Sequence, residues 1–191
     1  MKLHRFIYIV IVFLVSNALI IGAYHNDDNM HDQRITDAYG IEEKHVVKEL
    51  TPKEAVDKIE NDEDFYLMMG FSSCPWCQAL MPYYNQIAKE KGVKEIFYVD
   101  ILEMRNNENS VNRSYYLYLW DFVKDELQAM YPSFSRIVAP TTIAVKDKVI
   151  VSMFVGTVDD HEEVDGVLPP MNDDQISRLK NILKNFFDTL K

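Results

Sequence analysis

The only two cysteines of the 191-residue chain are Cys74 and Cys77, three positions apart with Pro75 and Trp76 between them. Side chains at positions i and i+3 share one face of a helix, so the two thiols can close a small disulfide ring. The continuous apolar run that precedes them has the length of a buried strand, and a helix is predicted to begin at the pair. The sequence therefore places two thiols where a strand ends and a helix begins.

The start of a helix is predicted to make the two thiols chemically different. It presents free backbone N–H groups and the positive end of the helix dipole, which stabilise an anion and lower the pKa of Cys74. Pro75 would be the first helical residue, where its missing N–H costs nothing. Cys77 lies one turn further in and is predicted to be more buried, with a higher pKa. In such a pair Cys74 attacks a substrate disulfide, and Cys77 then attacks Cys74 to release the substrate.

A zinc half-site and an inert structural disulfide are alternatives for the same two cysteines. Zinc needs two further ligands, and His45 or His161 would have to supply them because the chain has no third cysteine. A disulfide across three residues closes so small a loop that it stabilises the fold little. Redox chemistry is therefore the favoured function of the pair.

The elements around the pair alternate between strands and helices. Strands are predicted at 46–50, 64–71, 95–101, 141–145 and 149–155, with helices at 51–61, from the cysteine pair to about 91, at 111–131 and at the C-terminal end. Residues 103–110 and 159–174 are predicted to be loops, and the acids and His161 of the second one are predicted to be solvated. This order predicts an α/β fold with helices on both faces of a central mixed sheet.

Two of these helices carry apolar stripes that are predicted to face the core. In the helix at 111–131 the predicted inward residues are Tyr115, Leu119, Phe122 and Val123. In the C-terminal helix they are Ile176, Leu179, Leu183, Phe186 and Leu190. The aromatic run at 115–122 could also line a peptide groove, but core packing is the favoured prediction.

The N-terminus predicts export or membrane anchoring. Lys2 and Arg5 precede an apolar run at 6–24 that is about as long as a bilayer-spanning helix. Cleavage near Gly22 would make it a signal peptide, and an uncleaved run would be a single-pass membrane anchor. Both alternatives place the rest of the chain on the extracytoplasmic side, either secreted or at the cell membrane, where disulfides persist.

Composition divides the remaining chain and excludes one class of partner. After the signal or anchor at 1–24, residues 25–44 are polar and acidic. Their apolar residues recur with neither helix nor strand periodicity, so this segment is predicted to be a linker. Residues 45–191 are predicted to form one folded domain, because 48% of the chain is hydrophobic and can supply a core. The formal net charge of −10 argues against nucleic acid as a partner.

Four features together resemble the thioredoxin superfamily over residues 45–190. They are Cys-Pro-Trp-Cys between a buried strand and a helix, Pro82 five residues past the second cysteine, Val-Ala-Pro-Thr-Thr at 138–142, and Gly156 after the strand hairpin. The combination is also similar, more narrowly, to exported thioredoxin-like proteins of Gram-positive bacteria, including those described as bacteriocin transport accessory proteins.

The resemblance implies a role for each residue of the site. Cys74 matches the nucleophile and Cys77 the resolving thiol of a redox-active disulfide. Pro140 matches a cis-proline that presents the backbone of Ala139 to an extended substrate chain. An ordinary proline at the start of a strand is the alternative for Pro140. Trp76, inside the motif and predicted to be exposed beside the nucleophile, is a candidate for contacting the substrate.

The implied activity is that of a thiol–disulfide oxidoreductase acting on cysteines of proteins or peptides, with no cofactor and no metal. A membrane redox partner could supply its electrons. Met68 stands where thioredoxins carry a buried acid. This departure and the exported location together tilt the predicted direction of exchange toward oxidase or isomerase, while reductase stays open. A non-catalytic binding module, or a carrier of a soft metal such as Cu(I), is the alternative function.

Overall fold

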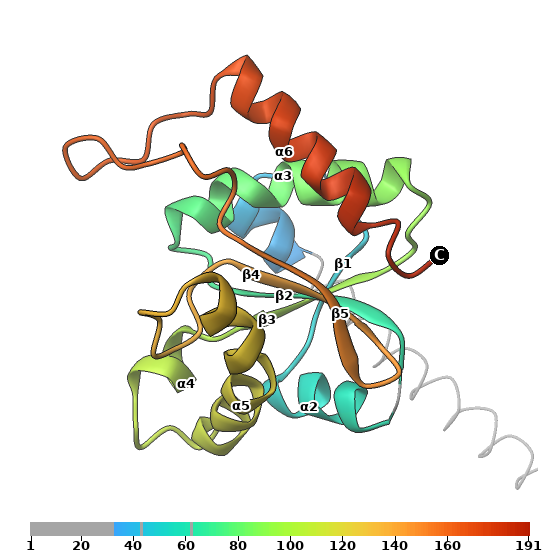
Figure 1. The fold of residues 1–191 in the computed structure, drawn as a ribbon, viewed down its shortest axis with the longest axis vertical. Coiled ribbons are helices and arrows are strands. Elements are labelled where there is room, and N and C mark those ends of the chain that lie inside the picture. Colours follow the sequence, from blue (N-terminus) through green and yellow to red (C-terminus); the bar gives the residue numbers. More distant parts are fainter. Residues whose placement is uncertain (1–32, 43, 62) are drawn as a thin grey trace, which may run out of the picture.

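The computed structural model describes residues 33–42, 44–61 and 63–191, in which a five-stranded sheet lies between two helical layers (Figure 1). The strands are β1 (Val47–Glu49), β2 (Phe65–Gly70), β3 (Ile96–Asp100), β4 (Thr141–Lys146) and β5 (Val149–Val155). The helices are α2 (Pro52–Glu60), α3 (Pro75–Glu90), α4 (Leu102–Asn106), α5 (Arg113–Met130) and α6 (Asp173–Phe186).

The sheet is mixed, as predicted, and its strand order is β1-β3-β2-β4-β5. β1, β3 and β2 are parallel, whereas β4 pairs with β2 and with β5 in antiparallel fashion. Every residue of β2 is buried, because this central strand is covered on both faces. The register sets Met68 of β2 beside Tyr98 of β3 on one side and Thr142 of β4 on the other.

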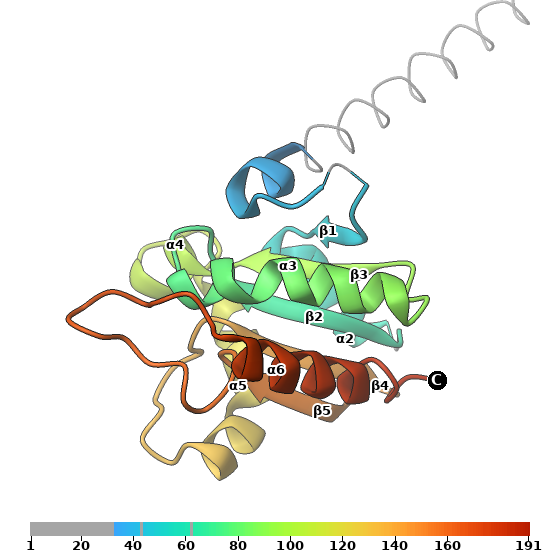
Figure 2. The same ribbon diagram turned by 90° about the horizontal axis from the view of Figure 1, so that it is seen from above.

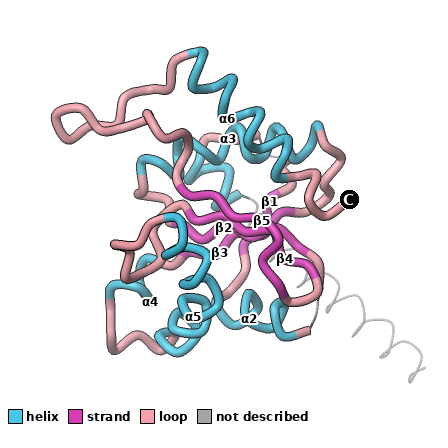
Figure 3. Tube along the Cα trace, in the orientation of Figure 1, coloured by secondary structure: helices cyan, strands magenta, loops and turns pink. Residues whose placement is uncertain are grey.

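Two hydrophobic cores lie on opposite faces of the sheet. Figures 1 and 2 show α3 and α6 side by side on one face, and Figure 3 shows α2, α4 and α5 on the other. Successive side chains of a strand point to opposite faces. Accordingly, Tyr66 and Met68 enter the core beneath α3 and α6, while Phe65, Leu67 and Met69 enter the core beneath α2 and α5.

The termini of three helices carry residues that are typical of helix starts and ends. In α2 the Thr51 side chain accepts from the Glu54 N–H and the Glu54 carboxylate accepts from the Thr51 N–H, which completes the capping box. α3 ends before Gly92, whose φ of +73° favours glycine. In α6 Asn172 and Gln175 form a second capping box, which the sequence analysis did not identify.

The predicted core faces of α5 and α6 are largely confirmed. In α5 Leu119 and Val123 are buried, but the helix turns so that Tyr116 and Leu127 complete the buried face. Tyr115 and Phe122 only pack against its edge. The buried residues of the α6 stripe are Leu179, Leu183 and Phe186, with Ile176 and Leu190 half-buried. The aromatic run at 115–122 thus contributes to the core, as favoured.

One of the two predicted loops contains a short helix instead. α4 begins directly after β3, where the Asp100 carboxylate accepts a hydrogen bond from the Leu102 N–H at 2.8 Å. Met104 anchors the helix because its side chain is buried in the core shared with α5. Within residues 103–110 a single buried methionine gives no periodic pattern, so the sequence did not predict this helix.

Part of the predicted linker is also folded. Residues 33–39 are helical, and Ile35, Tyr39 and Ile41 are buried in the core beneath α3 and α6. Ile35 and Tyr39 are four positions apart and so share one face of the helix. The linker prediction is therefore wrong for residues 33–42. Polar residues separate the three buried apolar residues, so the sequence shows no clear helical periodicity there.

The predicted signal or anchor at 6–24 lies outside the described residues. In the part of the chain that the structure describes, no helix is both long and apolar enough to cross a bilayer.

Candidate active site

Cys74 and Cys77 lie where β2 ends and α3 begins, as predicted. Cys74 is the N-cap of α3, and its Sγ accepts a hydrogen bond from the Cys77 backbone N–H at 3.4 Å. Pro75 is the first helical residue. Both cysteines are free thiols; Cys74 is 4% exposed and Cys77 is completely buried. The thiol nearer the surface is therefore the one at the start of the helix.

The two thiols have opposite pKa shifts, which confirms the predicted asymmetry. The pKa of Cys74 is lowered to about 7, chiefly because the Cys77 side chain donates a hydrogen bond to it. Burial opposes this shift, while the backbone N–H groups of Cys77 and Trp76 and the charge of Arg105 support it. Burial raises the pKa of Cys77 far above its ordinary value, and the neighbouring Cys74 raises it further.

Arg105 is a residue of the site that the sequence analysis missed. α4 holds its guanidinium 4.8 Å from the centre of the Phe71 ring. Its positive charge contributes to the lowered pKa of Cys74. A usable signal existed, because Arg105 follows the end of β3 and the carboxyl ends of parallel strands meet at one edge of a sheet. The residue was overlooked because its segment was predicted to be a loop.

The loop before β4 lies against the nucleophile. The Ala139–Pro140 peptide bond is cis, as predicted, and the Cys74 thiol donates a hydrogen bond to the Ala139 carbonyl at 3.3 Å. The antiparallel register of β2 and β4 pairs Met69 with Thr141 and so brings this loop to the cysteines. On the far side the Gly156 N–H donates to the Pro140 carbonyl at 2.9 Å, which ties the loop to the end of β5.

Trp76 is half-buried, not exposed as predicted. Its indole N–H donates a hydrogen bond to the backbone carbonyl of His161 at 3.1 Å. The segment at 157–171 is thus tied to the motif at His161. This segment follows β5 and returns toward the start of α6, which is the long loop at the left of Figure 1.

His161 is 3% exposed, so the prediction that it is solvated is wrong. One ring nitrogen is hydrogen-bonded to the Thr157 hydroxyl at 2.8 Å and the other to the Pro169 carbonyl at 2.7 Å. His45 precedes β1, and the parallel pairing of the strands puts that end of β1 at the sheet edge opposite the cysteines. Within the described ranges no three His, Cys, Asp or Glu side chains are grouped so as to hold a metal ion.

A cavity of about 520 Å³ adjoins the motif and the cis-proline loop. Trp76 and Ala139, which adjoin the cysteines, line it together with Tyr131 and Phe134. These two rings follow α5 and stack with their centres 4.9 Å apart. The cavity therefore offers aromatic surface next to a backbone segment that lies against the Cys74 thiol.

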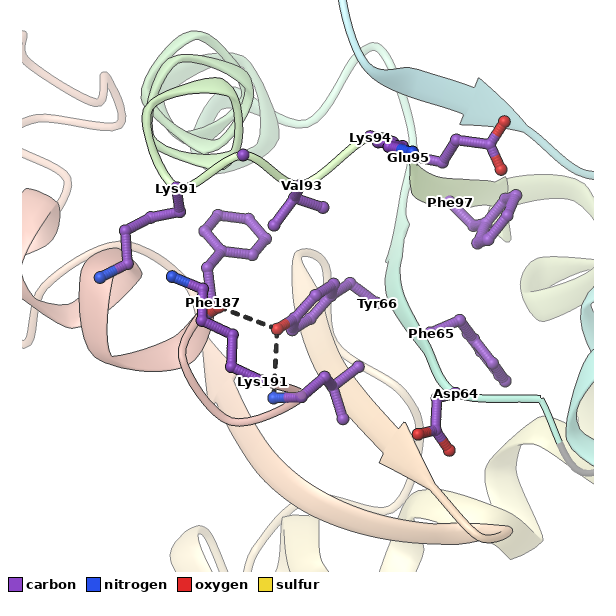
Figure 4. Close-up of a pocket in the computed structure, with 12 residues that line it drawn as sticks. Asp64, Phe65, Tyr66, Lys91, Val93, Lys94, Glu95, Phe97, Phe187 and Lys191 are labelled. Carbon is purple, nitrogen blue, oxygen red and sulfur yellow. Dashed lines mark hydrogen bonds between the residues drawn. The ribbon is translucent and has the colours of Figure 1, made fainter.

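A larger cavity, of about 600 Å³, lies at the opposite edge of the sheet (Figure 4). The Tyr66 hydroxyl points into the space between the elements, where it donates to the Phe187 carbonyl at 3.0 Å and accepts from the Leu190 N–H at 3.3 Å. Lys91 and Lys191, both on its wall, pair with Asp188. Tyr66, Lys91 and Lys191 are thus engaged in structural contacts. The cavity lies at the amino ends of the parallel strands, away from the cysteines.

No protein-family model matches the chain, and no curated protein matches it. Solved structures that match include thioredoxin F from spinach chloroplast in its short form, at 16% identity over 73% of this chain and 95% of that chain, with a TM-score of 0.40. Oxidised thioredoxin from Plasmodium falciparum matches at 17% identity over 73% and 97%, with a TM-score of 0.39. Thioredoxin O2 from Arabidopsis thaliana, also oxidised, matches at 13% identity over 75% and 96%, with a TM-score of 0.42.

Proposed function

We propose that this protein is a thiol–disulfide oxidoreductase that exchanges disulfides with proteins or peptides through Cys74 and Cys77. The observation that carries the proposal is the opposite shift of two adjacent thiol pKa values at one helix start. At pH 7 about half of Cys74 is a nucleophilic thiolate, whereas Cys77 holds its proton until it is needed. A purely structural pair would need no such difference.

The proposed reaction balances in two steps. The Cys74 thiolate attacks one sulfur of a substrate disulfide, the substrate S–S bond breaks, and its other sulfur leaves as a thiolate. Cys77 then loses its proton and attacks Cys74 Sγ, which breaks the mixed disulfide and releases the second substrate thiolate. The substrate is reduced and the Cys74–Cys77 pair is oxidised; the reverse sequence donates a disulfide.

The cavity beside the motif supports an extended polypeptide as the substrate. A chain lying along Ala139 would bring its cysteine to the Cys74 sulfur and could hydrogen-bond to the loop backbone. A neighbouring apolar side chain of that polypeptide would then enter the cavity between Trp76 and the stacked rings of Tyr131 and Phe134. The proposed substrate class is therefore a cysteine-containing segment with a large apolar side chain near the cysteine.

The pKa of Cys74 also bears on whether the protein oxidises or reduces its substrates. A strongly oxidising pair has a nucleophile with a pKa near about 3.5, which stabilises the reduced form, whereas a pKa near about 7 accompanies weaker oxidants. The value of about 7 for Cys74 thus supports reductase or isomerase activity over strong oxidase activity. The sequence analysis favoured oxidase or isomerase, from Met68 and the exported location, so the two arguments agree on isomerase and differ on oxidase.

We further propose that the domain works on the extracytoplasmic side, secreted or tethered by residues 6–24. The apolar run and the basic residues before it support this location. A membrane redox partner would recycle the cysteine pair in that compartment. The narrower resemblance to bacteriocin transport accessory proteins belongs to the same proposal, since those proteins are exported.

The experiment that tests the activity follows thiol exchange between the detergent-solubilised full chain and a disulfide-linked peptide. Cys74→Ser is expected to abolish exchange, and Cys77→Ser to accumulate a protein–peptide mixed disulfide visible by mass spectrometry without reductant. Ser73→Ala, on the exposed residue beside the pair, is the matched control and should retain full exchange. Unchanged exchange in Cys74→Ser, or tight Cu(I) binding without exchange, would overturn the proposal in favour of the metal carrier.

A further inference from the structure

The cavity beside the cysteine motif carries a negative charge that the exchange reaction does not use. The rings of Trp76, Tyr131 and Phe134 line it, and so does Asp159. Asp159 is exposed, and within the described residues its carboxylate has neither an ion pair nor a hydrogen bond. Among the described residues that line the cavity, none is a lysine or an arginine. A carboxylate therefore lies beside aromatic surface without a cation of the protein to neutralise it.

A tight turn fixes the position of Asp159. The His161 N–H donates to the Val158 carbonyl at 3.0 Å, which makes Asp159 and Asp160 the two central residues of the turn. Val158 and His161 are buried and anchor the turn in the body of the protein. The Asp160 carbonyl accepts a hydrogen bond from the Gln175 side chain at 3.0 Å, which ties the turn to the first turn of α6. Asp159 is thus held at the wall of the cavity.

The cation that reaches this turn neutralises Asp160 and not Asp159. The Arg178 guanidinium lies 2.6 Å from the Asp160 carboxylate and 2.9 Å from that of Asp174. The loop at 157–171 contains no lysine or arginine of its own. It holds three further exposed acids without an ion pair in the described part of the chain, namely Glu162, Glu163 and Asp165. The rim of the cavity around Asp159 is therefore negative, in a chain whose formal net charge is −10.

His161 also lines the cavity, and its hydrogen bonds are satisfied by a neutral ring. The Pro169 carbonyl can only accept, so Nε2 of the ring carries the hydrogen in that bond. The Thr157 hydroxyl can donate to Nδ1, which then needs no hydrogen of its own. The histidine thus offers Asp159 no positive charge.

A cationic side chain on a long apolar stem fits this combination of rings and charge. Lysine and arginine pack their stems on apolar surface while the charged head stays at the rim. Aromatic faces attract such a head, and Asp159 attracts it further. A glutamate in the same place would meet a like charge, and a purely apolar side chain would leave the carboxylate unpaired.

We propose that the cavity binds a lysine or arginine of the substrate polypeptide, close in sequence to the cysteine that Cys74 attacks, with the cation at Asp159. Asp159 then sets specificity by touching the substrate and takes no part in the transfer of electrons. This inference rests on the proposed function. It narrows the large apolar side chain of the proposed substrate to an apolar stem that ends in a positive charge.

The test uses peptides that differ at one residue beside a cysteine linked to 5-thio-2-nitrobenzoate. The variable residue is arginine, norleucine or glutamate, placed one or two positions before or after the cysteine. Each turnover of the reduced, detergent-solubilised full chain releases one chromophore, whose appearance gives a second-order rate constant. At low salt the best arginine peptide should react about fivefold faster than its norleucine counterpart, and the glutamate peptide should be slowest. In 1 M NaCl the advantage of arginine should fall below about twofold.

Two substitutions at Asp159 test the residue itself. Asp159→Asn keeps the shape of the side chain and suits a turn, and it should reduce the advantage of arginine over norleucine to below about twofold. Asp159→Lys should reverse the order, so that the glutamate peptide reacts faster than the arginine peptide. Glu163→Gln is the matched control, because it removes an equal charge from the same loop at a residue that does not line the cavity. It should retain an advantage of about fourfold.

The possible failures separate the two proposals. A wild-type protein that releases no chromophore from any peptide contradicts the proposed function itself. Release at equal rates from all peptides, or fastest release from the norleucine peptide, contradicts the cationic specificity alone. A full arginine advantage in Asp159→Asn would show that the cation binds elsewhere, which overturns the role of Asp159.

Discussion

The indole N–H of Trp76 donates a hydrogen bond to the carbonyl of His161, 85 positions further along the chain. The same histidine is held through its ring by Thr157 and by the Pro169 carbonyl. The long loop between β5 and α6 is therefore fastened at one buried residue and, through it, to the motif that carries the cysteines. The cavity beside Ala139 depends on this arrangement, because Trp76 and His161 both line it.

Replacing His161 by leucine is expected to destabilise the protein by about 1–3 kcal/mol, because the buried Thr157 hydroxyl and the half-buried Pro169 carbonyl lose their partner. Urea unfolding of the purified full chain measures this change. Trp76 should also move, which the tryptophan fluorescence spectrum reports. Glu163→Gln alters an exposed residue of the same loop and should stay within about 0.5 kcal/mol. Equal stability of the two variants would show that the histidine does not fasten the loop.

The alkylation rate of Cys74 is expected to follow a titration with its midpoint near pH 7. The fold lowers this pKa, so the reactive thiolate is lost as pH falls below 7, whereas an ordinary cysteine loses it below about 8.5. Iodoacetamide labelling with mass spectrometry of the modified peptide measures the midpoint. Cys77 should stay unlabelled across the same range because burial raises its pKa. A Cys74 midpoint above pH 8 would contradict the electrostatic account of the site.

Arg105→Gln is expected to raise the pKa of Cys74, since it removes a cation that favours the thiolate. At pH 6 the alkylation rate should fall about threefold, while at pH 9 it should match that of the unaltered protein. The matched control is Lys124→Gln, which removes a cation that pairs with Asp121 on α5. An equal loss at both pH values would indicate a change in access to the sulfur and not in its pKa.

Phe134→Ala is expected to raise KM for peptide disulfides about tenfold, because the cavity loses one of its two stacked rings. A small disulfide that reaches only Cys74 should react at the unaltered rate. Steady-state exchange with both kinds of substrate measures the difference. Met130→Ala, which changes an exposed residue of α5, serves as the control. An equal loss of exchange rate with both substrates would show that the variant acts on the Cys74 sulfur. That result would exclude a peptide-binding role for the cavity.

Strong local signals predicted most of the elements around the site. β2 was recognisable as an unbroken apolar run, and the start of α2 as a capping box, because each depends only on neighbours in the chain. The helix at 33–39 and α4 were missed, because each is anchored by very few apolar side chains. Such short helices are stabilised by tertiary packing and leave little periodicity in the sequence.

The sequence by itself determined the cysteine pair, its place at a strand-to-helix junction and, through the resemblance, the proline beside it. These features depend only on residue type and short spacing, so they can be recognised without knowledge of the fold. Only the tertiary structure decided that the charge of Arg105 acts on the pKa of Cys74, that His161 holds Trp76, and that Tyr39 is hydrogen-bonded to Tyr98. Each of these contacts joins distant positions whose residue types are ordinary. Their proximity follows from strand order and helix packing, which no local pattern specifies.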